Sequence, residues 1–291
     1  MTPLDISNNY CTNHPKLNSE LGGGEQGFDI SILTMDLPIP ASTPIFNGYF
    51  SDWHSVCEAA NISREDSSIV EPFDSVRWMA RQREMLALAR IGNYPRPTNL
   101  PILVAISNPE FIVDLGGGSG WTSELLSKSK VNGYKNYLVL EIPSVCAEFS
   151  QEFSEDSRRS FFSSISEAPE WMISRTDILY SNSVLQYFQD HSTLMKLVST
   201  LSPKYILLDD FMTSTGETFY SLQNYYGIKI PHCFSSVLDI LKTCAELGYE
   251  LLVNSDYHSP VAAGLEARVQ GASNSGSGVG GSRSLLFKKV S

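Results

Sequence analysis

The chain has 291 residues, 42% of them hydrophobic, so it can bury the core of one large or two small soluble domains. Its formal charge is −11, and its 21 basic residues form no Lys/Arg block, which argues against a nucleic-acid partner. The longest apolar runs are far shorter than the roughly 20 residues that cross a bilayer, and the polar N-terminus lacks the features of a secretory signal. We therefore expect no membrane span and a cytoplasmic location.

Cysteine and histidine are scattered along the chain. The five cysteines never adopt a C-x-x-C spacing, and the five histidines form no pair at metal-ligand spacing. The sequence therefore predicts free thiols and no metal site.

The first hundred residues divide into two parts. Residues 1–44 mix Asn, Ser, Pro and a Gly22-Gly23-Gly24 run, a composition that predicts a flexible arm. Residues 45–100 contain apolar positions at helical spacing, with an amphipathic helix expected from Val76 to Arg90 and a break near Pro95. This part is predicted to be a helical N-terminal subdomain.

Residues 101–291 alternate short β-branched runs with helical stretches, which is typical of βαβ units. The predicted fold is α/β: a Rossmann-like, doubly wound, seven-stranded sheet, mostly parallel, with an antiparallel last strand. Residues 212–231 are expected to be a loop-rich insert, and the Gly/Ser-rich residues 271–282 a flexible hairpin loop. Strands are predicted at 111–115, 137–141, 160–164, 177–182, 205–210, 249–254 and 284–289, and helices at 121–129, 144–153, 191–200 and 235–247.

A glycine-rich turn follows the first of these strands. It reads Asp114-Leu115-Gly116-Gly117-Gly118-Ser119-Gly120, and its glycines let the backbone approach a ligand closely. The spacing is D-x-G-x-G-x-G; the dinucleotide fingerprint G-x-G-x-x-G would need glycine where Trp121 stands.

The second strand ends at an acidic residue. Glu141 can accept hydrogen bonds from the two hydroxyls of a ribose, and the acidic Asp114 suits a cationic ligand. S-adenosylmethionine (SAM) offers a sulfonium and no pyrophosphate, so the pair favours SAM over a nicotinamide cofactor. The alternative is that the glycines only make a tight turn and that Glu141 is a solvated strand end.

With these residues the chain resembles class I SAM-dependent methyltransferases. A narrower resemblance, over residues 45–290, is to a family of methyltransferases associated with bacterial surface-polysaccharide genes. The motifs that carry it are Phe46-Asn47-Gly48-Tyr49-Phe50 with Trp53, Arg77-Trp78, the glycine-rich turn, Leu140-Glu141-Ile142-Pro143, Ser181-Asn182-Ser183-Val184-Leu185-Gln186-Tyr187, Ile230-Pro231 and Gly248-Tyr249.

The resemblance implies a cofactor site at the glycine-rich turn. Glu141 would hold the ribose and Ile142 would pack on the adenine, while Ser164 stands where many class I enzymes place an acidic residue that contacts the adenine amine. The methionine end of SAM would lie on Asp114, Gly116, Gly117, Gly118 and Gly120.

The acceptor site is expected where the fourth strand ends. Ser181 and Asn182 should line the cofactor side of this point, with Gln186 as a catalytic candidate and Tyr187 beside the acceptor. A base is needed only if the acceptor must lose a proton, and the candidates are Asp209, Asp210 and His232. Each has an alternative role: Asp210 as a turn cap, His232 as a surface loop residue, and Gln186 with Tyr187 as the start of a helix.

The insert 212–231 carries aromatic and amide side chains. Gln223 and Tyr226 are candidates for binding a sugar-like ring, although the same composition also suits a homodimer surface. Trp53 and Trp78 could fold over the cofactor or simply pack between subdomain and sheet.

The leading hypothesis is methyl transfer from SAM to oxygen or nitrogen of a small acceptor, with a sugar or glycan precursor suggested by the resemblance. Two alternatives stay open: a nicotinamide-dependent oxidoreductase, and a non-catalytic binding or scaffold protein with the same fold.

Overall fold

The computed structural model describes residues 46–61, 71–93, 98–131, 133–225, 228–258 and 278–290, which all belong to one compact unit beginning at Pro38. The predicted N-terminal arm, residues 1–44, lies outside the described residues, and so does most of the predicted hairpin loop, residues 271–277. In the described ranges no helix is long and apolar enough to span a membrane.

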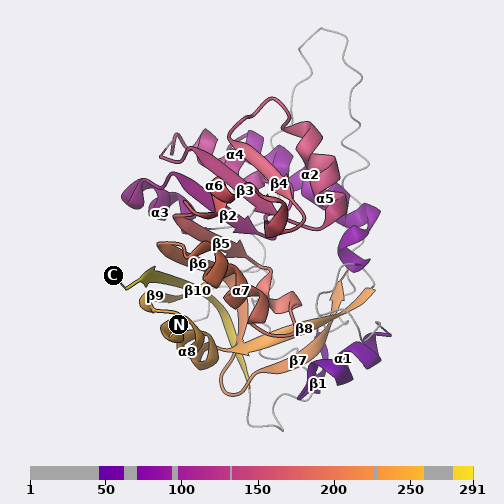
Figure 1. The fold of residues 1–291 in the computed structure, drawn as a ribbon. Coiled ribbons are helices and arrows are strands. Elements are labelled where there is room, and N and C mark those ends of the chain that lie inside the picture. The colour runs from indigo at the N-terminus through magenta and orange to yellow at the C-terminus, as the bar shows by residue number, and fades with distance from the viewer. Residues whose placement is uncertain are drawn as a thin grey trace, which may run out of the picture. The chain divides into compact units, whose positions relative to one another are not determined.

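The described residues form one ten-stranded sheet rather than the predicted seven strands, and its central part has the order β4-β3-β2-β5-β6-β10-β9 (Figure 1). The first five are parallel, and β10 lies antiparallel between β6 and β9. This arrangement confirms the predicted Rossmann-like class. The strands of this central part are β2 (Phe111–Leu115), β3 (Asn136–Leu140), β4 (Arg159–Phe162), β5 (Ile178–Asn182), β6 (Tyr205–Ser214), β9 (Tyr249–Asp256) and β10 (Val279–Lys289). The other three strands, described below, join this part through a short parallel pairing at the end of β6.

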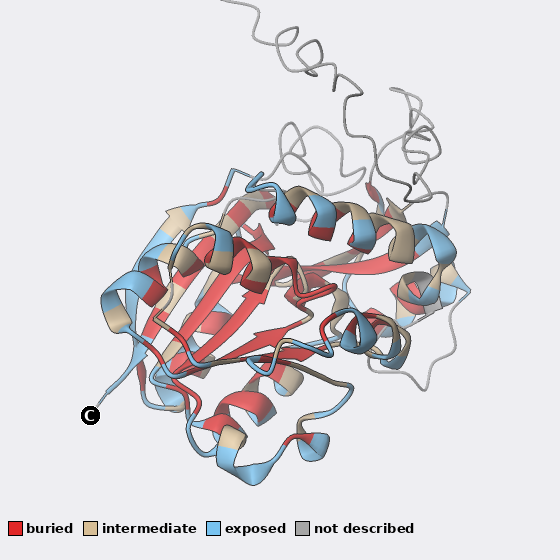
Figure 2. Ribbon diagram, turned by 90° about the horizontal axis from the view of Figure 1, so that it is seen from above, coloured by how far each residue is buried: buried red, intermediate tan, exposed pale blue. Residues whose placement is uncertain are grey.

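Helices cover both faces of this sheet, which is why all five residues of β2 are buried (Figure 2). Alternate side chains point to opposite faces: Ile112 packs with α3 (Leu100–Ser107) and α4 (Trp121–Lys128), and Val113 packs with α7 (Ser192–Leu201) and α8 (Val237–Glu246). The remaining helices are α1 (Trp53–Ala60), α2 (Val76–Arg90), α5 (Pro143–Glu152) and α6 (Glu170–Ile173), with 3-10 turns η2 (Glu71–Asp74), η3 (Ile165–Glu167) and η4 (Leu185–Tyr187).

The predicted loop-rich insert is wrong: residues 212–231 are largely β-structure. β6 continues to Ser214, and β7 (Phe219–Tyr225) pairs antiparallel with β8 (Ile228–Ser236). The Phe219 and Phe234 rings stack at 4.7 Å between the two strands. Polar Ser221 and Gln223 share the buried face with Phe219, so hydrophobicity does not alternate along β7 and the strand pattern is hidden.

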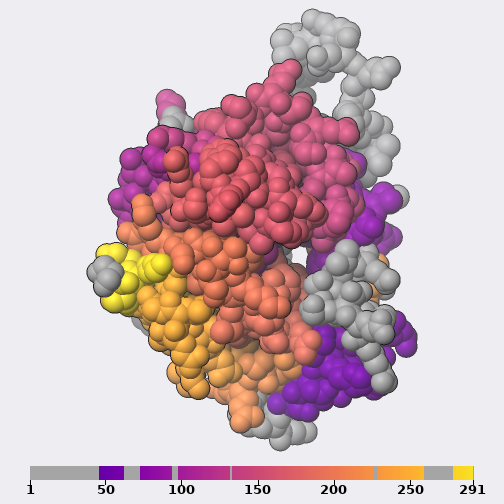
Figure 3. Space-filling view, in the orientation of Figure 1, coloured from indigo at the N-terminus to yellow at the C-terminus, as the bar shows by residue number. Residues whose placement is uncertain are grey.

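Residues 45–100 contribute a strand as well as helices. β1 (Phe46–Phe50) pairs antiparallel with β7 and extends the β7–β8 hairpin, and Figure 3 shows this indigo segment against the orange hairpin. α1 packs on the same hairpin, whereas α2 packs on α4 and α5 through Met85, Leu86 and Ala89. A subdomain boundary at residue 100 stays a prediction.

Candidate functional site

The glycine-rich turn joins β2 to α4 in a conformation that needs glycine. Gly116, Gly118 and Gly120 have φ of +69°, +56° and +71°. A Cβ on Gly118 would lie 2.0 Å from Gln82 Oε1, and one on Gly116 would lie 2.3 Å from Val184 Cγ2. Both the backbone conformation and the close neighbours therefore exclude larger residues here.

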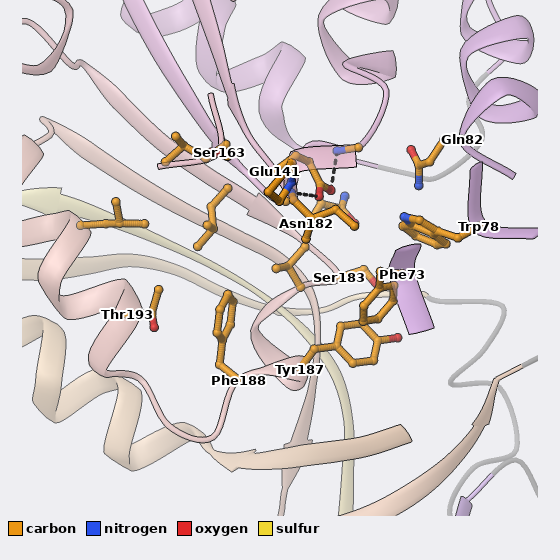
Figure 4. Close-up of a pocket in the computed structure, with 18 of the residues that line it drawn as sticks. Phe73, Trp78, Gln82, Glu141, Ser163, Asn182, Ser183, Tyr187, Phe188 and Thr193 are labelled. Carbon is orange, nitrogen blue, oxygen red and sulfur yellow. Dashed lines mark hydrogen bonds between the residues drawn. The ribbon is translucent and has the colours of Figure 1, made fainter. Parts of the chain in front are cut away.

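A cavity of about 480 Å³ opens at the carboxyl ends of β2, β3 and β5 (Figure 4). In parallel α/β sheets this is the edge where ligands bind, at the point where the strand order reverses. The predicted site residues that line the cavity are Gly116, Gly118, Glu141, Ile142, Ser164, Asn182 and Tyr187.

Glu141 follows β3 and faces the cavity. Its Oε1 accepts a hydrogen bond from the Gly118 N–H at 3.0 Å, and its Oε2 accepts one from the Ile142 N–H at 2.8 Å (Figure 4). Burial raises the pKa of this carboxyl group above its ordinary value. A carboxylate has about four acceptor positions, so after these two bonds it can still accept two ligand hydroxyls.

Gln82 is a site residue that the sequence analysis did not single out. It stands on α2 and is 2% exposed, and its Oε1 accepts the Ser119 N–H at 2.9 Å. The signal in the sequence was a polar residue on the apolar stripe that includes Met85 and Leu86.

Asp114 does not line the cavity but lies behind the turn. It is 1% exposed and accepts a hydrogen bond from the Tyr137 hydroxyl at 2.6 Å. Burial, opposed by that hydrogen bond and reinforced by the nearby Glu141, raises the pKa of Asp114 to about 7. A Cβ on Gly117 would lie 2.5 Å from the Asp114 carboxylate, and Gly120 also lies outside the cavity lining. Asp114 and Gly117 therefore shape the turn from behind.

Asn182, at the end of β5, is oriented by a buried chain of hydrogen bonds. Its Nδ2 donates to the Tyr180 hydroxyl at 2.9 Å, which donates to Thr98 Oγ1 at 2.8 Å, which donates to Asp209 Oδ2 at 2.9 Å. The Asn182 Oδ1 is buried and has no hydrogen-bond partner among the described residues. This amide oxygen, on a residue that lines the cavity, can accept a donor from a ligand.

The structure does not bring the acidic base candidates to the cavity. Asp209 accepts hydrogen bonds from Thr98, from the Asn99 N–H and from Ser284. Asp210 is 3% exposed and accepts the Ser282 hydroxyl at 2.8 Å. Asp209 is therefore held by the start of α3 and by β10, and Asp210, which has a φ of +49°, is held by β10.

Tyr187 lines the cavity, but four other predicted residues on the acceptor side, His232, Gln186, Gln223 and Ser181, are buried outside its lining. His232 packs edge-on against Phe46, with ring centroids 4.7 Å apart, and burial lowers its pKa to about 3. An imidazole with so low a pKa is a poor base at neutral pH. Gln186 donates to Ser183 Oγ at 3.0 Å, whereas Gln223 and Ser181 are buried within their strands, and Tyr226 lies outside the described residues.

Comparisons with known proteins found similar solved structures but no similar sequence. No protein-family profile and no curated protein sequence matches the chain. The 1,6-didemethyltoxoflavin-N1-methyltransferase of Burkholderia thailandensis is 13% identical, covering 76% of this chain and 83% of that one, with a TM-score of 0.44.

Two further solved structures are similar to the same degree. A SAM-dependent methyltransferase from Clostridium acetobutylicum is 17% identical, covering 65% of this chain and 89% of that one, with a TM-score of 0.43. The magnesium protoporphyrin IX methyltransferase of Synechocystis is 12% identical over 82% and 92% of the two chains, with a TM-score of 0.42. At these identities and scores the likeness concerns the fold alone, and function is argued from the site.

Proposed function

We propose that the chain is a SAM-dependent methyltransferase that acts on an oxygen or nitrogen atom of a small acceptor. The observation that carries this proposal is the occupancy of the N–H groups at the glycine-rich turn. The Gly118 and Ser119 N–H groups donate to Glu141 and Gln82, so they are not available to a pyrophosphate. The same oxygens make the turn rich in acceptors, which suits a cationic ligand.

The cavity supplies groups that match the parts of SAM. Glu141 would accept hydrogen bonds from the ribose hydroxyls, Ile142 would pack on the adenine, and the unpartnered Asn182 Oδ1 would accept the ammonium of the methionine part. When bound there, SAM supplies an electrophilic methyl group. The protein would hold the acceptor in line with that group, since alignment is the main requirement of a direct displacement.

The test is calorimetric titration with SAM, S-adenosylhomocysteine (SAH) and NAD. We expect micromolar binding of SAM and SAH, about −8 kcal/mol, and at least tenfold weaker binding by Glu141→Ala. Gly118→Ala should also weaken binding because its Cβ would collide with Gln82. Gly248→Ala is the matched control, since Gly248 also has a positive φ of +83° but no atom within 4 Å of its Cβ position.

Either of two outcomes would contradict the proposal. Folded protein that binds NAD and neither SAM nor SAH would favour an oxidoreductase. Folded protein that binds none of the three ligands would favour a scaffold role. A sugar or glycan acceptor, a homodimer and the absence of a nucleic-acid partner stay predictions from the sequence.

A further inference from the structure

Four aromatic rings from separate segments meet at one side of the cavity. Phe73 of η2 lies 5.2 Å from Trp78 of α2, 4.8 Å from Tyr187 of η4 and 5.8 Å from Tyr225 of β7, measured between ring centroids. We call these four residues the aromatic wall. All four line the cavity, and Figure 4 shows the three that are labelled, Phe73, Trp78 and Tyr187, close together.

The aromatic wall is supported from behind. Phe73, Tyr187 and Tyr225 pack against a cluster of buried residues that includes Trp53 and Leu222. This cluster joins α1 to the β7–β8 hairpin, so the three rings pack against side chains of regular secondary structure. A rigid aromatic surface loses little conformational entropy when a ligand binds to it.

The wall also carries an unsatisfied donor. Trp78 Nε1 is buried and has no hydrogen-bond partner in the part of the chain that the structure describes, and an indole nitrogen can only donate. Figure 4 shows this nitrogen on the side of the indole that faces Asn182. Leaving a buried donor unpaired is unfavourable, so an acceptor atom on a ligand would recover free energy by pairing with it.

From these observations we infer that the methyl acceptor is a planar aromatic ring system with a hydrogen-bond-accepting oxygen, bound against the aromatic wall. The inference rests on the proposed function, which assigns the part of the cavity around Glu141 and Ile142 to SAM. Aromatic rings attract one another through their faces and edges, in addition to the gain from the apolar area that they bury. The oxygen accepts the Trp78 Nε1–H.

The chemical step balances without another reactant. An oxygen or nitrogen of the acceptor forms a bond to the methyl carbon while the carbon–sulfur bond breaks, and its electron pair stays on sulfur to give SAH. The proton of the acceptor hydroxyl or amine leaves to solvent.

The test is calorimetry on protein saturated with SAH, using 1-naphthol, 2-naphthol, naphthalene, methyl glucoside and methyl mannoside as probes. The naphthols should bind and the glycosides should not. Phe73→Ala should weaken all three naphthalene-type probes at least tenfold. Trp78→Phe keeps a ring but removes the donor, so it should weaken the naphthols about tenfold and leave naphthalene within twofold.

Controls separate this inference from the proposed function. Trp171→Phe changes an exposed tryptophan on α6 and should alter no probe. SAH affinity should be unchanged in all three variants, because none of the replaced side chains is assigned to the cofactor. If the unmodified protein did not bind SAH, the proposed function itself would be refuted.

Two outcomes would overturn the inference while SAH still binds. One is binding of the glycosides with no binding of either naphthol, which would return the acceptor to the sugar class. The other is naphthol binding that Phe73→Ala and Trp78→Phe leave unchanged, which would put the aromatic ligand elsewhere.

Discussion

At the scale of single residues, the site depends on side chains that never touch the cavity. Asp209 was a candidate base, but it is the end of the hydrogen-bond chain that runs through Thr98 and Tyr180 to Asn182. This series of hydrogen bonds requires the Asn182 amide nitrogen to donate to Tyr180, so the amide oxygen is the atom left for a ligand. Asp209 is therefore a positioning residue in the proposed site.

Removing one link of this chain should weaken cofactor binding. Tyr180→Phe deletes the hydroxyl that receives Asn182 Nδ2, so SAH affinity should fall about tenfold by calorimetry, equivalent to roughly 1.4 kcal/mol. Tyr249→Phe is the matched control, because it also deletes a buried hydroxyl, one that donates to the Pro203 carbonyl at 2.8 Å. The two variants should lose similar stability, and equal losses of SAH affinity would contradict the role of the chain.

Asp114 should make stability depend on pH. Its pKa of about 7 in the folded protein lies above the ordinary value of 3.8, so the folded state retains a proton that the unfolded state releases. Its favourable contribution is complete below about pH 4 and is lost as the pH rises through about 7. Compared with Asp114→Asn, the unmodified protein should lose a few kcal/mol of unfolding free energy between pH 4 and pH 8.

Urea unfolding at both pH values measures this difference, with the exposed Asp239→Asn as a control. A difference between the unmodified protein and Asp114→Asn that does not change with pH would show that the buried carboxyl group ionises normally.

At the scale of elements, α2 completes the glycine-rich turn from outside the sheet. It presents Gln82 to the Ser119 N–H and buries Met85 and Ala89 against α4. Predicting this helix from its apolar spacing succeeded, because that pattern is local. Its partner was not predictable, because nothing in residues 76–90 specifies which turn the polar Gln82 will meet.

Replacing Gln82 tests this contact. Gln82→Ala leaves the buried Ser119 N–H without its partner, which costs about 1–3 kcal/mol, and SAH affinity should fall about tenfold or more. Gln151→Ala, at an exposed position on α5, should change neither stability nor affinity, as measured by thermal unfolding and calorimetry. Unchanged SAH affinity in Gln82→Ala would separate α2 from the cofactor site.

At the scale of the whole molecule, one cluster of buried side chains extends from the cavity, where it includes Leu115 and Leu140, to Phe287, which does not line the cavity. Phe287 of β10 is 1% exposed in the core between α7, α8 and the strands, whereas the cavity lies at the carboxyl ends of β2, β3 and β5. Phe287→Ala should therefore cost about 3–5 kcal/mol of unfolding free energy and leave SAH affinity unchanged in the folded protein.

Leu252→Ala, at a site 48% exposed on the edge strand β9, should change stability by less than about 0.5 kcal/mol. Chemical unfolding and calorimetry check both variants. A fall in SAH affinity for folded Phe287→Ala would show that the core and the site are coupled.

The sequence by itself determined the parallel strands, most of the helices and the glycine-rich turn with Glu141. β2 has the predicted bounds, 111–115, and α2 the predicted Val76–Arg90, because hydrophobic periodicity and turn glycines are local signals. The tertiary structure decided what local signals do not contain. It paired β7 with both β8 and β1, although hydrophobic and polar residues do not alternate along β7. These pairings provide the hydrogen bonds that the backbone N–H and C=O groups of a buried segment require.

Tertiary structure also decided which polar residues reach the cavity. Asp209, Asp210 and His232 were candidates because of their positions near a strand end or in the insert. Hydrogen bonds to α3 and β10 hold the two carboxylates, and packing against Phe46 buries the imidazole, all outside the cavity lining. Three residues that do reach the cavity, Gln82, Phe73 and Trp78, come from helical segments more than thirty residues before the turn. A shift of one residue in the register of a strand reverses the direction of every side chain on it. The sequence could therefore suggest candidate site residues, but only the folded sheet determines which of them face the cavity.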